Sequence, residues 1–160
     1  MKYKIIPTVF AHSKKEFNKR FNKLIPTARD IQIDFMDGKF VKSKSITLKD
    51  TRPLKEYGNN FEAHLMYFHP ENYIDNLKQK GFKKIIFHYE ALRNQDRIMN
   101  LIAQINRARM KAFIALNPKT DIKKIIKYLQ IIDGVLLMGH EPGIEHIKLL
   151  PSIYMKIRSL

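Results

Sequence analysis

Short apolar segments alternate with amphipathic segments at a steady interval along the 160 residues. The apolar segments have the length and period-two pattern of strands, whereas the segments between them place apolar side chains at helical spacing. The expected strands are 3–9, 31–36, 61–66, 84–88, 112–116 and 134–138. Because no hairpin signal joins any two of them, the pattern predicts a parallel sheet with crossover helices. We expect a single α/β domain over residues 1–160, built from six β/α units.

Several residues mark where the intervening helices begin and end. Ser13 and Glu16 have the spacing of a capping box. Pro70 is a favoured first helical residue, and Gly81 is a favoured stop. Another helix is expected from about Asn94.

The last third of the chain predicts two more helices. The first follows Thr120 or Asp121, either of which can cap it. Its expected apolar face consists of Ile122, Ile125, Ile126 and Leu129. The second spans 151–160, and the least regular part of the chain, 42–60, predicts only a short helix near 54–57.

Two of the expected strands carry polar side chains on one face only. In these strands Gln32, Asp34 and Met36, and Glu62, His64 and Met66, alternate with apolar residues. If helices cover the apolar faces, the mixed faces meet in a shared interior near the carboxyl ends of the strands, where parallel α/β proteins place their sites. Asp34 in an otherwise apolar strand is costly without a partner, which favours a functional role. His64 taken alone is typical of a hydrogen-bonded core histidine.

The net charge of +15 is the strongest feature of the composition. A basic surface attracts nucleic acid or a phosphorylated metabolite. The lysines are spread along the chain and no nucleic-acid-binding motif accompanies them, so solvated helix faces explain them better than a nucleic-acid partner. The chain has no apolar run of 18 residues, so no membrane span is expected. The absence of cysteine excludes disulfides and thiolate metal sites and fits a cytoplasmic protein.

Six short motifs in the expected strands resemble, in the same order, those of the ribulose-phosphate 3-epimerase family. They are Pro7-Thr8, IDFMDGKFV at 33–41, AHLM at 63–66, HYEA at 88–91, ALNPKT at 115–120 and LLMGHEPG at 136–143. The resemblance extends over essentially the whole chain. It implies an incomplete TIM barrel of six β/α units whose substrate is a phosphorylated pentulose.

The resemblance also implies a mechanism and a set of site residues. In that family two aspartates exchange a proton at C3 through an enediolate, and a divalent metal (Zn, Fe or Mn) is held by two histidines and two aspartates. By position, Asp34 matches an aspartate that is both metal ligand and acid/base, and His64 matches a histidine ligand. The predicted substrate-binding residues are Thr8, Gln32, Met36, Met66, Met138 and Gly143.

The chain departs from the family pattern at several points. Gln32 stands where the family has a histidine ligand, and Glu145 follows Gly143 where the family has a phosphate-closing loop of glycines, so Glu145 is expected to repel a phosphate. The 160 residues end after the sixth helix, without the strands that bring the opposing aspartate and the main phosphate loops. We therefore expect weak or incomplete epimerase activity. His140 and His146 are expected in loops near the mouth, and His88 in the interior.

Three functional interpretations stay open at this point. The first is an epimerase-like isomerase of a sugar phosphate, either weak or completed by another chain. The second is a non-catalytic module that binds a phosphometabolite or RNA, and the third is an incomplete barrel with no function of its own. An open sheet leaves two unpaired edges, so we expect a homodimer that covers the gap. A smaller closed barrel of six strands, or a separate chain that supplies the missing units, is the alternative.

Overall fold

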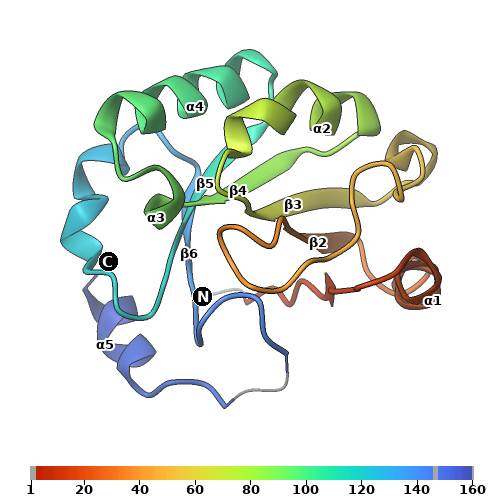
Figure 1. The fold of residues 1–160 in the computed structure, drawn as a ribbon, viewed down its shortest axis with the longest axis horizontal. Helices are drawn as coiled ribbons and strands as arrows, with labels where there is room; N and C mark the ends of the chain where they lie inside the picture. Colours follow the sequence, from red (N-terminus) through yellow and green to blue (C-terminus); the bar gives the residue numbers. More distant parts are fainter. Residues whose placement is uncertain (1–2, 146–147, 160) are drawn as a thin grey trace.

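Six parallel strands form one sheet in the computed structural model, which describes residues 3–145 and 148–159. Each strand pairs with the next along the sequence (Figure 1). The strands are β1 (Thr8–Val9), β2 (Asp30–Met36), β3 (Asn60–Met66), β4 (Lys84–His88), β5 (Lys111–Leu116) and β6 (Gly134–Leu137). The expected incomplete α/β barrel is confirmed. Among the described residues β1 and β6 each have one neighbouring strand, so the sheet is open and the alternative of a closed six-stranded barrel is wrong.

The first strand is shorter than the expected segment 3–9. Only Thr8 and Val9 align with β2, and the carbonyl of Pro7 accepts a hydrogen bond from Gln32 N–H at 3.0 Å. Proline has no N–H with which to extend the ladder toward the N-terminus. As a result Tyr3 and Ile5 lie outside the sheet and are largely exposed.

Most helices begin and end where the capping residues predict. Ser13 Oγ accepts a hydrogen bond from Glu16 N–H at 3.2 Å, and Asn94 Oδ1 accepts one from Arg97 N–H at 3.0 Å. Gly81 ends its helix in the left-handed conformation, with φ +104°. The α-helices are α1 (Lys14–Leu24), α2 (Ile74–Lys80), α3 (Tyr89–Leu92), α4 (Gln95–Arg107) and α5 (Ser152–Arg158), and two 3₁₀ helices are η1 (Leu54–Glu56) and η2 (Pro70–Tyr73). The short helix α3 is not predicted by the sequence pattern, and Leu160, at the end of the last expected helix, lies outside the described residues.

The expected α-helix after Asp121 is instead a pair of 3₁₀ helices, η3 (Ile122–Lys124) and η4 (Ile126–Tyr128). Asp121 caps the first of them, through a hydrogen bond from Lys123 N–H to its side chain. The buried residues are Ile122, Ile125 and Tyr128, which are three residues apart and match the three-residue turn of a 3₁₀ helix. Ile126 and Leu129, assigned to the apolar face by α-helical spacing, are exposed.

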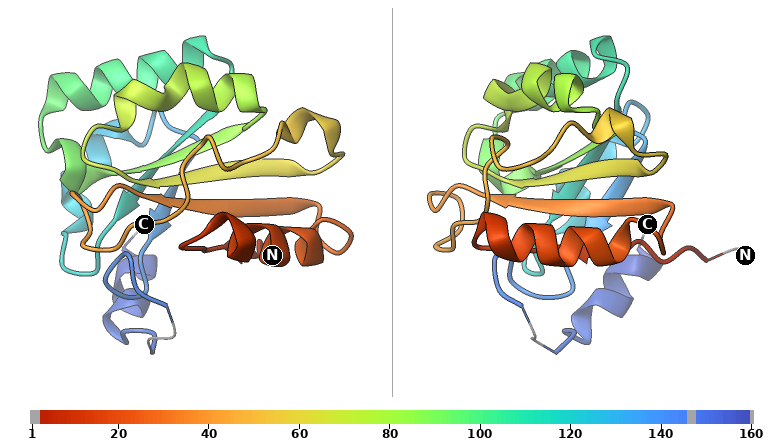
Figure 2. Two further views of the ribbon diagram at one scale, coloured as in Figure 1. Left: turned by 45° about the vertical axis from the view of Figure 1, so that its right-hand side comes forward. Right: turned by 90° about the vertical axis from the view of Figure 1, so that its right-hand side faces the viewer.

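The outward face of the sheet packs against the helices, and the inward face carries the polar site residues. Helices α1, α2 and α4 lie around the outside of the curved sheet (Figures 1 and 2). The outward side chains of the strands pack with these helices in one large core, in which Phe21 of α1 stacks on Phe61 of β3. The inward side chains of β2 and β3 are in register, with Asp34 beside His64 and Met36 beside Met66. Within the described residues, no helix is both long enough and apolar enough to cross a membrane.

Candidate functional site

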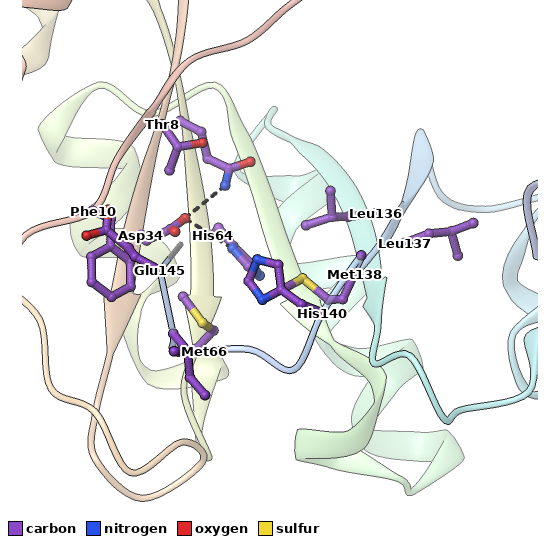
Figure 3. A pocket seen from close by; sticks show the side chains of 14 residues that line it. Thr8, Phe10, Asp34, His64, Met66, Leu136, Leu137, Met138, His140 and Glu145 are labelled. Atoms are coloured by element: carbon purple, nitrogen blue, oxygen red, sulfur yellow. Dashed lines mark hydrogen bonds and ion pairs between the residues drawn. The ribbon is translucent and has the colours of Figure 1, made fainter. Parts of the chain in front are cut away.

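A cavity of about 360 Å³ lies on the inward face of the sheet, near the carboxyl ends of the strands (Figure 3). It is bounded by β1, β2 and β3 on one side and by β6 with its following loop on the other. The predicted site residues that line it are Thr8, Gln32, Asp34, His64, Met66, Met138 and Gly143. Met36 does not line it. This residue packs against Met66 and Phe10 and faces a neighbouring cavity with Lys39 and Lys44.

Asp34 is the buried carboxylate of this cavity. Its Oδ1 atom accepts hydrogen bonds from Gln32 Nε2 at 2.8 Å and from His64 Nδ1 at 3.1 Å. The strand register accounts for both contacts, because Gln32 is two residues away on the same face of β2 and His64 is the direct neighbour of Asp34 on β3. Asp34 therefore has the partners that its burial requires.

His64 is held on both sides of its ring. Its Nδ1–H donates to the Asp34 carboxylate at 3.1 Å, and its Nε2 atom lies 2.9 Å from Nε2 of His88, so that one of these two nitrogens donates to the other. His88 is completely buried under the ring of Phe40, with ring centroids 4.8 Å apart. The prediction that His88 packs in the interior agrees with this position, but its contact with His64 is not apparent from the sequence.

The chain of polar contacts continues from His88 to Glu90. His88 Nδ1 lies 3.5 Å from Glu90 Oε2, which is longer than a good hydrogen bond. Neither His88 Nδ1 nor Glu90 Oε2 makes a hydrogen bond within the described residues, so the two side chains lie close together without a good hydrogen bond between them.

The ionisation of these two groups follows from their surroundings. Burial lowers the pKa of His88 below its ordinary value, so the neutral ring is favoured. Burial alone would raise the pKa of the Glu90 carboxyl, but contacts with His88, the Thr120 hydroxyl and the Asn117 N–H (2.8 Å) hold it below its ordinary value. Glu90 is thus fixed from the β5 side independently of His88.

The mouth of the cavity is formed by the loop after β6. Gly143 has φ +86°, and its carbonyl accepts a hydrogen bond from Ser43 Oγ at 2.7 Å, which ties this loop to the loop after β2. Glu145 accepts hydrogen bonds from Arg20 of α1 at 2.5 and 3.2 Å. The negative charge that was expected to repel a phosphate is therefore paired with a guanidinium. His146 lies outside the described residues.

His140 belongs to the same loop and also lines the cavity. Its Nδ1 atom lies 2.8 Å from the carbonyl oxygen of Glu141, to which it donates. Figure 3 shows its ring beside Met138, on the β6 side of the cavity. The sequence indicated a loop position near the mouth but not that the ring reaches the cavity.

The donor atoms present do not fit a resident divalent metal. The described residues hold no group of three or more histidine, cysteine, aspartate or glutamate side chains arranged to hold a metal ion. The predicted pair, Asp34 and His64, has the neutral amide of Gln32 as its third neighbour. Catalytic zinc sites have at least three protein ligands, so the pair alone leaves a metal undercoordinated.

Comparisons with known proteins give a consistent result. A sequence profile described as the ribulose-phosphate 3 epimerase family matches residues 2–160. A ribulose-phosphate 3-epimerase of Schizosaccharomyces pombe is 30% identical over 165 residues, covering 98% of this chain and 70% of the relative. The cytoplasmic isoform of the enzyme from Oryza sativa subsp. japonica is 26% identical, covering 98% of this chain and 70% of that protein. The enzyme from Buchnera aphidicola is 28% identical, covering 99% of this chain and 70% of its own length.

Proposed function

Because this chain belongs to the ribulose-phosphate 3-epimerase family, we propose that it is a sugar-phosphate isomerase that moves the proton on C3 of ribulose 5-phosphate. The chain covers 70% of the length of each of the three ribulose-phosphate 3-epimerases named above, which supports the proposal. A cytoplasmic location belongs to the same proposal and rests on the rice relative, whose name describes a cytoplasmic isoform.

Asp34 is the base in this proposal. A proton next to a carbonyl is only weakly acidic, so its removal requires a positioned base and donors near the developing oxyanion. The observation that carries the proposal is that Asp34 is a buried carboxylate in the cavity, fixed by Gln32 and His64 at 2.8 and 3.1 Å. The Gln32 amide and the Thr8 hydroxyl are the neutral groups on the same side that are available to the oxyanion.

The 160-residue chain should turn over slowly. The described residues include no second aspartate in the cavity and no lysine or arginine in its lining to hold a phosphate. We expect a kcat below about 1 per second, the lower end of the ordinary enzyme range. A coupled assay with ribulose 5-phosphate measures this, with Asp34→Asn as the inactive control. An Asp34→Asn variant as active as the wild type would remove Asp34 from the mechanism.

Any divalent metal should bind weakly, with Asp34 and His64 as its only strong ligands. Titration with zinc, iron or manganese should show an affinity that mild chelation overcomes. The His64→Ala variant should bind at least 10-fold more weakly than the wild type, in line with the loss of one ligand. Equal affinity in both proteins would show that the metal binds elsewhere.

A homodimer that covers the open side of the sheet is part of the same proposal. Five large apolar side chains in and before α5 are between 50% and 66% exposed; these are Ile144, Leu149, Tyr154, Met155 and Ile157. Full burial of an exposed apolar side chain is worth roughly 1.5–3 kcal/mol, so each of these half-exposed side chains forgoes about half of that, which association across a two-fold axis would recover in part. Sedimentation at about 0.15 M salt tests this, because salt of that strength screens the positive charge beyond about 8 Å. A monomer at micromolar concentration would contradict it.

A further inference from the structure

Inversion at C3 requires more than the base. A base that removes and returns the proton on one face exchanges it with solvent but regenerates the same epimer. Inversion requires a second acid/base group that reaches C3 from the opposite face. This inference rests on the proposed function and concerns which side chain performs that second step.

Within residues 3–145 and 148–159, the titratable side chains that line the cavity are Asp34, His64, His140 and Glu145. Asp34 is the base. His64 has both ring nitrogens engaged, one by Asp34 and the other by His88. Glu145 is bound to Arg20 through both of its carboxylate oxygens, at 2.5 and 3.2 Å. An acid that is ion-paired to a guanidinium is a poor proton donor, because release of the pair costs the charge-assisted hydrogen bonds.

His140 differs from the other three in its geometry. It follows β6, whereas Asp34 lies on β2, and Figure 3 shows the two side chains entering from the two sides of the cavity. Its Nδ1–H donates to the carbonyl of Glu141, which fixes the orientation of the ring. Its Nε2 atom has no hydrogen-bond partner among the described residues, so it is available to a bound substrate. An imidazole gives and takes a proton readily near neutral pH.

We propose that His140 is the second acid/base residue of this chain. In one direction the Asp34 carboxylate takes the proton from C3, and the C–H electron pair forms the C2–C3 double bond of an enediolate. The protonated His140 ring then gives its Nε2 proton to the opposite face of C3, and the enediolate electrons return to the new C–H bond. Asp34 is left protonated and His140 neutral, and both are restored by exchange with water. The reverse direction uses neutral His140 as the base and protonated Asp34 as the acid.

The test follows deuterium uptake at C3 in deuterated water, starting from ribulose 5-phosphate and, separately, from its C3 epimer. The wild type should exchange both sugars and interconvert them. His140→Gln should keep exchange of the epimer that faces Asp34, lose exchange of the other, and interconvert them at least about 100-fold more slowly, the usual contribution of one general acid/base. Asp34→Asn should show the complementary pattern. His69→Gln, an exposed histidine in the loop after β3, is the matched control and should behave as the wild type.

The possible outcomes separate this inference from the proposed function. Wild-type interconversion by His140→Gln, in a variant whose thermal unfolding matches that of the wild type, would overturn the role of His140. Exchange without interconversion in the wild type would do the same while leaving Asp34 as the base. A wild type that exchanges neither sugar would refute the proposed function, and the role of His140 with it. If His140→Gln unfolds at a lower temperature than the wild type, His140→Asn replaces it and is judged by the same exchange and interconversion measurements.

Discussion

Replacing the buried His88 should change how the stability of the protein depends on pH. The groups that face its ring are His64 on β3 and Glu90 on α3, and Phe40 covers it. Burial lowers the pKa of His88 below the ordinary value of 6.5, so the unfolded chain binds a proton that the folded chain does not. The stabilisation is complete above pH 6.5 and is lost as the pH falls toward the folded-state pKa.

The magnitude follows from this linkage. A histidine that stays neutral in the folded state but titrates with its ordinary pKa in the unfolded state lowers the free energy of unfolding as the pH falls. At one pH unit below the ordinary pKa this loss reaches up to about 1.4 kcal/mol. Glu90 affects the free energy of unfolding in a lower pH range. Its folded-state pKa lies below the ordinary value of 4.5, so its contribution is present above pH 4.5 and is lost only below that.

Urea unfolding of the wild type and of His88→Phe, measured from pH 7.5 to 5.5, tests the prediction. The variant should be less stable at pH 7.5, because His64 Nε2 loses its hydrogen-bond partner, but its free energy of unfolding should fall by about 1 kcal/mol less than that of the wild type across the range. His69→Phe, at an exposed position, should keep the wild-type slope. Equal slopes in the wild type and in His88→Phe would refute the assignment of His88 as a buried neutral ring.

Three further changes test the fold that holds the site. Gly81→Ala should lower the free energy of unfolding by more than about 1 kcal/mol, because φ is +104° and the new Cβ would lie 2.9 Å from Lys55 N; unchanged urea unfolding would contradict this. Phe21→Ala should cost about 3–5 kcal/mol, since Phe21 is completely buried against Phe61; a loss below 1 kcal/mol would show that the core collapses around the gap. Lys156→Met should speed amide exchange in α5, because Lys156 Nζ donates to the Asn117 and Thr120 carbonyls at 2.8 and 2.5 Å; exchange as slow as in the wild type would assign the docking of α5 to its apolar contacts.

The strands could be predicted from the sequence because burial on two faces fixes their pattern. In β2 and β3 the alternation of Ile33 with Asp34 and of Ala63 with His64 gives both the strand and its inward face. The 3₁₀ helices after Asp121 could not be predicted, because Ile122, Ile125, Ile126 and Leu129 have α-helical spacing, while the three-residue spacing of Ile122, Ile125 and Tyr128 is also present in the same segment. Their distinction depends on which side chains the sheet buries, and that is a tertiary property.

The contacts of the polar side chains could be predicted only where strand register places two residues side by side. Asp34 and His64 are neighbours through strand register, which follows from the periodicity of the strands. His88 is the last residue of β4, so alternation predicts its inward face, but its contact with His64 depends on how far each ring reaches across the sheet. His140 lies in the loop after β6, where strand alternation no longer indicates the direction of a side chain.

The separation of the two faces of the sheet has a consequence for the way this fold tolerates change. The outward face holds the large apolar core, so substitutions there are expected to act on stability. The inward face holds the buried polar chain from Asp34 through His64 and His88 to Glu90, which the Thr120 hydroxyl anchors beyond β5. The close contacts run from Asp34 to His88, whereas Glu90 is held separately by Thr120 and Asn117. The surroundings of Asp34 are therefore supplied by β2, β3 and β4 together, and a substitution at His88 is expected to reach the base without touching the cavity.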